Sequence, residues 1–559
     1  MPLLRYFMIR AARLAVVPLQ RKLQRFLTSC DDPAAVQSEL LTRIITRQST
    51  TAFGRDHGFA DIRTVADYRR QVPVAPYERL APYIERMKLG ETDALIADDR
   101  VLQFALTSGT TAARKFIPIT RRYLRDYRRS WTYWGIQAYR DHRDRALGLR
   151  PIVQMVGDPD EFRTEAGIPC GNLSGFTALA QRRIARRQYA IPPICGKLTD
   201  PLAKYYLALR LSLGTPVAMF LAANPSTLVT LGRTLDNHKE SLLRDLHDGT
   251  LDPSLAIPAD IRLALQAKLK PKPAAARTLS AIAEKTGILR PMDVWHPGTI
   301  LIGTWTGGSM GPYLKQVPQF FGDAPIRDLG LLASEGRFTI PLANGTPSGV
   351  LDIASHFYEF IPEAEIDSAN PVVLGSHELE LGGSYFLIPT TTAGLYRYHI
   401  SDLVRVTGFL GRTPTVEFLG KGNRFANMTG EKLSEHHVTQ AMGALGWAVS
   451  AYTVAPIWNE TQPHYAILLE ESEDRTPFPA LDAALAEVNI EYAAKRQSGR
   501  LGPIRVALLP EGTWAAWDRA RLAKSGGSAE QYKRPCLQGD LKFADGMPVM
   551  EWVNSLVRT

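Results

Sequence analysis

Small hydroxyl-bearing residues and a glycine follow a short apolar run near residue 105. The run VLQFAL (101–106) has the length and composition of a strand, and the turn after it contains Thr107, Ser108, Gly109, Thr110 and Thr111. Such residues let backbone amides approach an anion and add hydroxyl donors, and Lys115 adds a positive charge. The segment FALTSGTTAARKFIPIT (104–120) therefore predicts a phosphate-binding loop. An ordinary loop after a strand has the same composition, and the segment does not follow the Walker A pattern GxxxxGK[ST].

A carboxylate ends a second apolar run, in the segment LGLLASEGRF (329–338). The apolar residues have the length of a strand, and Ser334 and Glu335 come directly after them. Ligands of α/β proteins usually bind where strands end, and hard cations such as Mg²⁺ prefer oxygen ligands. Glu335 is therefore predicted to hold a Mg²⁺ ion that bridges ATP oxygens. A solvated glutamate at the start of a loop is the alternative.

Another carboxylate, Asp402, lies in the segment GLYRYHISDLVRVTGF (394–409), just before a run with strand character. At that place a carboxylate can accept hydrogen bonds from both hydroxyls of a ribose. Taken alone, Asp402 is better explained as an aspartate that ends a turn.

Alternating strands and helices must position these three segments. Thr120 is expected to cap a helix over 121–139, in which apolar residues recur at helical spacing. The runs TPVAMFLAA (215–223) and TILIGTW (299–305) have strand length and are separated by helical segments. This alternation predicts an α/β fold with layered sheets and helices.

After Val372 the alternation of predicted strands and helices gives way to a series of short predicted strands. The stretch HELELGGSYFLIPTTT (377–392) predicts a hairpin, and short strands follow it, so we expect a small β-barrel or meander there. Beyond residue 422, strand-like runs alternate with helical ones, which indicates a smaller α+β domain. The polar, glycine-bearing segment GKGNRFANMTGEK (420–432) is the candidate hinge between a large domain (1–421) and a small mobile one (422–559).

Composition restricts the class of protein. The chain has 559 residues, 45% of them hydrophobic, and a net charge of +10, which suits an enzyme of at least two domains that attracts anions. No nucleic-acid motif accompanies the positive charge, so no nucleic-acid partner is predicted. The four cysteines form no CxxC pair, which favours a reducing cytoplasm over a disulfide framework or a zinc site.

The N-terminal segment is apolar but basic. Residues 1–20 are interrupted by Arg5, Arg10 and Arg13, so neither a signal peptide nor a membrane span is predicted. We expect an amphipathic helix that docks on its own protein. Weak membrane-surface association through residues 1–25 is the alternative.

Taken together, the three segments resemble the auxin-responsive Gretchen Hagen family of acyl-acid amido synthetases. This family belongs to the adenylating superfamily of acyl-CoA synthetases, peptide-synthetase adenylation domains and luciferase. TSGTT with its following lysine resembles the family's phosphate loop, ASE its second nucleotide motif, and YRYHISD its ribose motif. TAFGRDHGF (51–59), VPVAPYERLAPYIERM (72–87) and QYKRPC (531–536) also resemble family segments, so the likeness extends over nearly the whole chain.

The resemblance implies a role for each matching residue. Residues 107–111 would line the ATP phosphates, with Lys115 nearby. Ser334 and Glu335 would contact the nucleotide and Mg²⁺, and Asp402 would bind the ribose. Lys533 matches the C-terminal lysine that reaches the phosphates in the closed state, which makes Lys533 and Glu335 the predicted catalytic residues. Arg128 and Trp305 are the predicted acyl-substrate contacts, with an exposed arginine and a core tryptophan as the alternatives.

The implied function is ATP- and Mg²⁺-dependent adenylation of a small carboxylic acid, followed by transfer of the acyl group to an amine, for which an amino acid is expected. An acyl-CoA ligase with a thiol acceptor is the alternative among enzymes. A catalytically inactive nucleotide-binding scaffold is the alternative outside them, against which the presence of Glu335, Asp402 and Lys533 argues. The sequence names neither the acid nor the amine.

Overall fold

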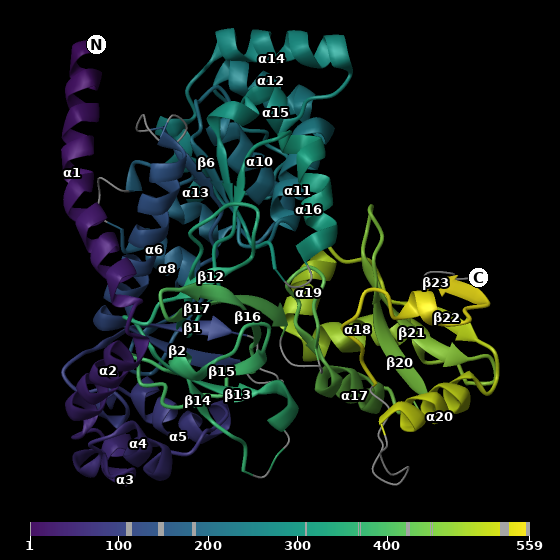
Figure 1. The fold of residues 1–559 in the computed structure, drawn as a ribbon. Helices are drawn as coiled ribbons and strands as arrows, with labels where there is room; N and C mark the ends of the chain where they lie inside the picture. Colours follow the sequence, from purple (N-terminus) through teal and green to yellow (C-terminus); the bar gives the residue numbers. More distant parts are fainter. Residues whose placement is uncertain are drawn as a thin grey trace. The chain divides into compact units, whose positions relative to one another are not determined.

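The chain forms two compact units in the computed structural model (Figure 1), one of Met1–Thr107 with Phe116–Leu419 and one built on Gly420–Thr559. The structure describes residues 2–107, 114–143, 150–181, 186–307, 310–366, 368, 370–420, 425–447, 449, 451–525 and 536–554. The predicted domain boundary, between residues 421 and 422, lies outside them.

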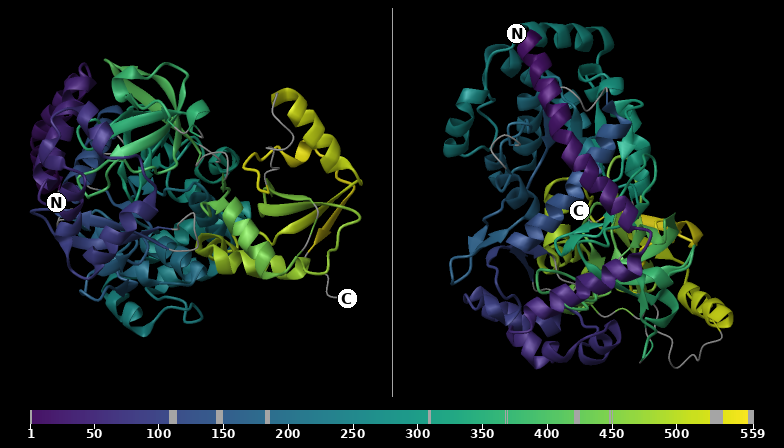
Figure 2. Two further views of the ribbon diagram at one scale, coloured as in Figure 1. Left: turned by 90° about the horizontal axis from the view of Figure 1, so that it is seen from below. Right: turned by 60° about the vertical axis from the view of Figure 1, so that its left-hand side comes forward.

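The first unit begins with a helical segment: α1 Pro2–Ser29, α2 Pro33–Gln48, α3 Ala52–Asp56, α4 Val65–Gln71 and α5 Tyr77–Lys88. Figure 2 shows α1 as one long helix, and its C-terminal part packs on α6 through Phe26 and Tyr133, whose stacked ring centroids are 5.1 Å apart. Asp32 caps α2 by accepting a hydrogen bond from the Ala35 amide (3.2 Å). No helix in the described residues combines the length and hydropathy needed to cross a bilayer.

The described ends of the predicted phosphate-binding segment, residues 104–107 and 114–120, lie in or beside the strands of a small sheet. Its strands are β1 Val101–Thr107, β2 Lys115–Thr120, β4 Phe162–Arg163 and β5 Pro169–Gly171, in the order β2-β1-β5-β4. Strand β2 continues directly into helix α6 (Arg121–Asp141), and the Thr120 hydroxyl accepts a hydrogen bond from the Tyr123 amide (3.1 Å). The predicted helix cap is therefore confirmed. Helix α8 (Leu173–Leu179) packs near β1.

A parallel sheet forms the α/β layer, as the sequence predicted. Its strands, in the order β3-β6-β7-β8, are β3 Ile152–Gln154, β6 Met219–Leu221, β7 Leu301–Gly303 and β8 Ile326–Arg327. Parallel neighbours need long crossovers, and these are helical: α10 Pro201–Ser212, α11 Ser226–Asn237, α12 Lys239–Asp248, α13 Ala259–Leu265, α14 Pro273–Thr286, α15 Pro291–Val294 and α16 Gly311–Phe321. Figure 1 shows these helices gathered around the sheet.

Seven strands of the described residues form one further sheet. In the order β11-β12-β17-β16-β15-β13-β14 they are β11 Thr339–Ile340, β12 Gly349–Leu351, β17 Thr413–Gly420, β16 Leu403–Leu410, β15 Ser384–Thr390, β13 Phe357–Pro362 and β14 Leu374–Gly375. The predicted small barrel is not confirmed, because the outer strands of this set, β11 and β14, are not hydrogen-bonded to each other.

The hairpin predicted over residues 377–392 is wrong in its first arm. Residues Ser376–Glu378 form a short 3₁₀ helix, since the Glu378 carboxylate turns back and accepts a hydrogen bond from the Gly375 amide (2.6 Å). The second arm is strand β15, whose partners are β13 and β16.

Buried polar bonds join the N-terminal helices to the seven-stranded sheet. The Gln37 amide donates to the carbonyls of Ile353 (2.7 Å) and His356 (2.8 Å). The Tyr68 hydroxyl is 2.8 Å from the Thr390 hydroxyl, and Arg69 donates to Glu359 (2.9 Å). These contacts link α2 and α4 to residues about three hundred positions later in the chain.

The second unit is an α+β domain, as the sequence predicted. Its main sheet has the order β20-β21-β22-β23, with β21 and β22 parallel. The elements are β18 Phe425–Ala426, β19 Leu433–Ser434, α17 Glu435–Ala444, β20 Tyr452–Ile457, β21 His464–Glu470, α18 Phe478–Val488, α19 Ile490–Gln497, β22 Arg505–Leu509, α20 Thr513–Ser525 and β23 Glu551–Asn554. Within this unit the buried carboxylate of Glu431 accepts bonds from the Met428 and Thr429 amides and from the Tyr465 hydroxyl.

Candidate active site

Glu335 lies in the tight turn of a short hairpin. Strands β9 (Leu332–Ala333) and β10 (Gly336–Arg337) are antiparallel and are joined by Ser334 and Glu335 alone. The Glu335 side chain is nearly buried, at 6% exposed. Helix α6 holds this turn, because the Tyr123 hydroxyl donates to the Ser334 carbonyl (2.9 Å).

The charge of the Glu335 carboxylate reaches three buried tyrosines. Burial raises the pKa of Tyr123 and Tyr398 well above the ordinary value and that of Tyr77 to about 12, and the charge of Glu335 adds to each shift. The Tyr77 hydroxyl accepts a hydrogen bond from the Phe116 amide (2.8 Å), at the start of β2. Tyr77 therefore contacts the strand that begins with Lys115.

Tyr398 also connects this turn to the third predicted segment, since the charge of Asp402 raises its pKa as well. Asp402 is 2% exposed, and its carbonyl accepts a hydrogen bond from the Leu387 amide of β15 (2.9 Å). The charges of Glu335 and Asp402 therefore both reach one buried tyrosine, although the two carboxylates come from different parts of the chain.

The arginine of the YRYHISD segment is part of the scaffold. Arg397 donates to the buried carboxylate of Glu359 (2.7 Å) and to the carbonyls of Val72 (2.6 Å) and Arg69 (3.1 Å). Its backbone has φ +44° and that of Ser401 has φ +65°, a region that side-chain-bearing residues seldom adopt. These bonds fix the tight path that brings Asp402 beside Tyr398.

Several predicted site residues lie outside the described residues. They are Ser108, Gly109, Thr110, Thr111 and Lys533. Thr107 is the last residue of β1 and Lys115 the first of β2, so the ends of the predicted phosphate loop are two neighbouring strands.

The two predicted acyl contacts each bond to a backbone carbonyl of the protein. Arg128 is exposed on α6, and its guanidinium donates to the Ala180 carbonyl. Trp305 is half-buried just after β7, and its indole donates to the Gly330 carbonyl (3.1 Å), close to the β9–β10 hairpin.

An aromatic row runs along α6 away from the Glu335 turn. Tyr123 stacks on Tyr127 (ring centroids 5.8 Å apart), Tyr127 meets Trp131 edge to face (6.4 Å), and Trp131 meets Trp134 (5.5 Å). The guanidinium of Arg337 lies over the Trp131 ring, 4.0 Å from its centroid. The sequence interpretation missed Arg337, although it lies two residues after Glu335, because nothing in the sequence distinguishes a buried arginine from an exposed one.

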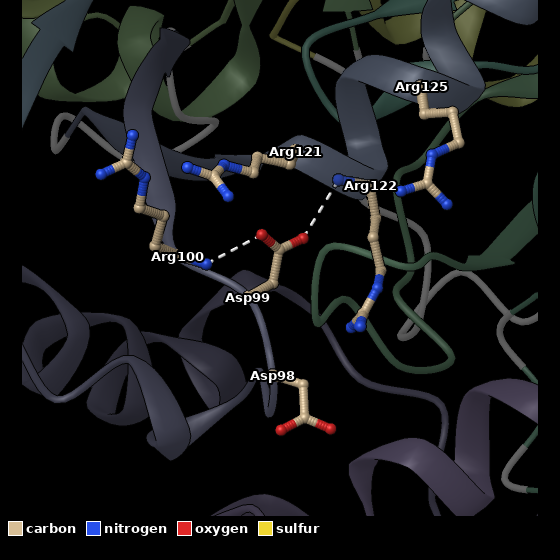
Figure 3. Close-up of a pocket in the computed structure, with 6 residues that line it drawn as sticks. All are labelled: Asp98, Asp99, Arg100, Arg121, Arg122 and Arg125. Atoms are coloured by element: carbon tan, nitrogen blue, oxygen red, sulfur yellow. Dashed lines mark hydrogen bonds between the residues drawn. The ribbon is translucent and has the colours of Figure 1, made fainter.

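A basic pocket of about 420 Å³ lies elsewhere in the first unit (Figure 3). It is lined by Asp98, Asp99, Arg100, Arg121, Arg122 and Arg125. The Asp99 carboxylate accepts from the amides of Arg100 (2.8 Å) and Arg122 (3.0 Å). This pocket is at the start of β1 and the end of β2, whereas segment 108–113 joins their other ends. It is therefore not the predicted nucleotide pocket.

The residues at the Glu335 turn fit a Mg²⁺ ion that arrives with ATP. The described residues contain no group of three or more His, Cys, Asp or Glu side chains that could hold a metal ion, so a closed protein cage is not formed there. Mg²⁺ commonly takes one or two carboxylates and completes its shell with water and phosphate oxygens. A single nearly buried carboxylate at a strand end suits that mode.

Relatives with known names share this architecture. Jasmonoyl–L-amino acid synthetase JAR6 of Nicotiana attenuata is 24% identical over 92% of this chain and 93% of its own length. Indole-3-acetic acid-amido synthetase GH3.8 of Oryza sativa subsp. indica is 26% identical, covering 90% and 87%. The solved structure of GH3.15 acyl acid amido synthetase has the same fold, with a TM-score of 0.63 and 20% identity over 96% of both chains.

Family profiles cover most of the sequence. The GH3 family N-terminal domain matches residues 22–326, the central domain residues 349–421 and the C-terminal domain residues 434–542. Since the first of these alone spans more than half of the 559 residues, the chain belongs to the GH3 family.

Proposed function

We propose that this protein is an ATP-dependent acyl-acid amido synthetase, which converts a carboxylic acid to its acyl-AMP and transfers the acyl group to an amino acid. The observation that supports the proposal is the nearly buried Glu335 turn, held by the Tyr123 hydroxyl of α6, together with the buried Asp402, in a chain of the GH3 family. The names of the relatives support the same activity.

Charge is the main barrier to adenylation. A carboxylate oxygen attacks the α-phosphorus of ATP, pyrophosphate leaves, and the acyl group gains AMP as a good leaving group. The protein lowers this barrier by holding and neutralising the phosphates, a task we assign to residues 107–111, Lys115 and Lys533. Glu335 would hold Mg²⁺, which supplies further positive charge to the phosphate oxygens. Asp402 would accept hydrogen bonds from the ribose hydroxyls.

The second step transfers the acyl group to nitrogen. The amine of an amino acid attacks the acyl carbon, AMP leaves, and the amine loses a proton as the amide forms. Water competes with the amine for the acyl-AMP, so the site has to exclude it. We assign this closure, and the exchange of catalytic surfaces between the two steps, to movement of the C-terminal domain about the segment 420–432.

The first experiment measures acid-dependent exchange of labelled pyrophosphate into ATP over a panel of carboxylic acids. At least one acid should support exchange in wild type, and Glu335→Gln should abolish it without lowering Tm. An inactive scaffold would show no exchange with any acid although it binds ATP. Wild-type exchange in Glu335→Gln would refute the Mg²⁺ assignment alone.

The second experiment identifies the acceptor. With ATP, Mg²⁺ and an accepted acid, mass spectrometry should detect an amide when an amino-acid mixture is present and little thioester when coenzyme A replaces it. The opposite result would make the protein an acyl-CoA ligase. We also propose a cytoplasmic location, for which buried thiols at Cys30, Cys170 and Cys195 are the support.

A further inference from the structure

Arg337 is a buried cation without a carboxylate partner. Its side chain is 0% exposed, and no ion pair joins it to any described acidic residue. One of its amino groups, Nη2, donates to the Leu329 carbonyl (2.7 Å), whereas the other, Nη1, has no hydrogen-bond partner among the described residues. A buried charge is costly unless it is paired and hydrogen-bonded.

The two acids whose charges reach Arg337, Asp328 and Asp352, are bonded to other groups, and only Oδ1 of Asp352 has no hydrogen-bond partner among the described residues. Asp328 accepts from the amide (2.6 Å) and hydroxyl (2.8 Å) of Thr306 and from the Gly330 amide (2.5 Å). Asp352 accepts from the hydroxyls of Ser130 and Ser355. Burial lowers the pKa of Arg337 to about 10, so the guanidinium is still charged at neutral pH.

Other buried arginines differ in how their charge is compensated. Arg210 forms no ion pair with a described residue and donates to the carbonyls of Thr250 (3.0 Å) and Lys270 (3.5 Å), whereas two others are paired. Arg397 forms an ion pair with Glu359 (2.7 Å), and Arg327 forms one with Asp141 (2.5 Å). Arg327 also has an Nη1 without a partner, but its charge is balanced. Arg337 has no such ion pair among the described residues. The ring of Trp131 faces its guanidinium instead, and this cation–π contact offsets part of the free-energy cost of burying the charge.

The position of Arg337 relates it to the substrate. Tyr123, at one end of the aromatic row, touches the Ser334–Glu335 turn, where the proposed function puts the reacting carboxyl. Trp131 is eight residues further along α6, or about 12 Å at the helical rise of 1.5 Å per residue. Trp131 is itself only half-buried, so on that side one ring separates Arg337 from solvent.

We propose that the acid substrate carries a second carboxylate at the end opposite its reacting carboxyl, and that Arg337 binds this second group. The inference rests on the proposed function, which supplies the reacting end. The acyl body would lie against Trp131, the one half-buried ring of the row, whereas Tyr123, Tyr127 and Trp134 are buried. The second carboxylate would complete the hydrogen bonds of Arg337 and balance its charge. Arg128, which is exposed and bonded to Ala180, would then not be the main acid contact.

The test uses straight-chain dicarboxylic acids of increasing length, each paired with the monocarboxylic acid of the same carbon count. In pyrophosphate exchange, wild type should prefer one or more diacids over the matched monoacids by about tenfold in kcat/KM, since a hydrogen bond to a charged group contributes that much discrimination. Arg337→Met should reduce the diacid rate to the monoacid level and leave monoacids within about twofold.

A stability measurement distinguishes a role of Arg337 in binding the substrate from a role in stabilising the fold. Arg337→Met removes a charge without a partner, so its Tm should be unchanged or higher. The matched control is Arg327→Met, which breaks a buried ion pair and should lower Tm while keeping the diacid preference. Arg128→Met should keep both the wild-type Tm and the preference for diacids. A preference that disappears in Arg128→Met but survives in Arg337→Met would overturn the assignment.

A binding measurement distinguishes this inference from the proposed function. Diacids should raise the Tm of wild type without ATP, and should not raise that of Arg337→Met. If diacids bind in this way but no acid supports exchange, the adenylating function fails and the Arg337 site stands. If monoacids exchange, diacids show no advantage at any length and Arg337→Met is neutral, the Arg337 site fails and the function stands.

Discussion

Arg397 and Asp402 are five residues apart in one segment and have different tasks. The Arg397 guanidinium donates its hydrogen bonds to Glu359 and to two backbone carbonyls. The charge of Asp402, like that of Glu335, raises the pKa of Tyr398. At this scale the sequence identifies residue types but not their environment. The roles of Glu335 and Asp402 come from the family resemblance of their segments and stay predictions, and Arg337 was missed because burial depends on partners from distant segments.

Nucleotide affinity tests the role of Asp402. Asp402→Ala should weaken ATP and AMP by about ten- to a hundredfold, since hydrogen bonds to a charged group contribute about 1.5–3 kcal/mol. Calorimetric titration measures the loss. The same substitution should affect binding of a dideoxyribose analogue much less, and equal losses for both ligands would rule out a ribose contact.

Asp126 gives a pH dependence of stability. Burial raises its pKa from 3.8 to about 6, against the opposing charge of Arg129. The folded protein therefore keeps a proton that the unfolded chain releases between about pH 4 and pH 6, and this stabilisation is lost as the pH rises through 6. A shift of this size corresponds to roughly 3 kcal/mol.

The measurement compares wild type with Asp126→Asn, which cannot titrate but can still accept the hydrogen bond from Thr392. From about pH 4 to about pH 7 the variant should gain in Tm relative to wild type. The pKa of nearby His356 is lowered to about 4 by burial, and its opposite contribution is present in both proteins, so it cancels in the difference. A constant difference in Tm would contradict the raised pKa.

Helix α6 and the β9–β10 hairpin together organise the site. The sequence predicted the helix and its Thr120 cap because that signal is local: a capping residue followed by helical periodicity. It also placed Ser334 and Glu335 at the end of an apolar run. The hairpin itself, with two-residue strands and a two-residue turn, is too short to give a pattern, and the 3₁₀ helix at Ser376–Glu378 is fixed by one side-chain bond to its own backbone.

The scaffold role of Arg397 makes a stability prediction at the scale of elements. Arg397→Met should cost about 3 kcal/mol, because it removes the buried partner of Glu359. Arg69→Met should cost less, since the Arg69 side chain is 30% exposed. Urea unfolding measures both. Full stability of Arg397→Met with lost ATP binding would instead make Arg397 a ligand contact.

At the scale of the molecule, the sequence predicted a large N-terminal part and a smaller α+β part because the pattern of predicted strands and helices changes between them. The predicted barrel is not confirmed, and the sequence could not decide between a barrel and a meander, since the order of strands in a sheet depends on pairing across long separations. Strand β12, for example, pairs with β17 about sixty-five residues later, which no local pattern reveals.

The division into two units motivates a kinetic prediction for Lys533. If this lysine serves only adenylation, Lys533→Ala should slow formation of acyl-AMP strongly and barely change amide formation from supplied acyl-AMP. Single-turnover kinetics with each starting material measure the two steps. Equal slowing of both would indicate a general closure defect, and no slowing of either would leave Lys533 as a solvated residue.

The bonds from α2 and α4 to the seven-stranded sheet determine when the protein can fold during synthesis. Gln37 and Arg69 are translated early, but their partners at residues 353–359 emerge from the ribosome only after some 300 further residues. Until then the polar groups of the N-terminal helices bond to water and their apolar faces stay uncovered. A fragment that stops near residue 326, where the N-terminal family profile ends, lacks these partners, so the N-terminal and central profiles together delimit one folding unit.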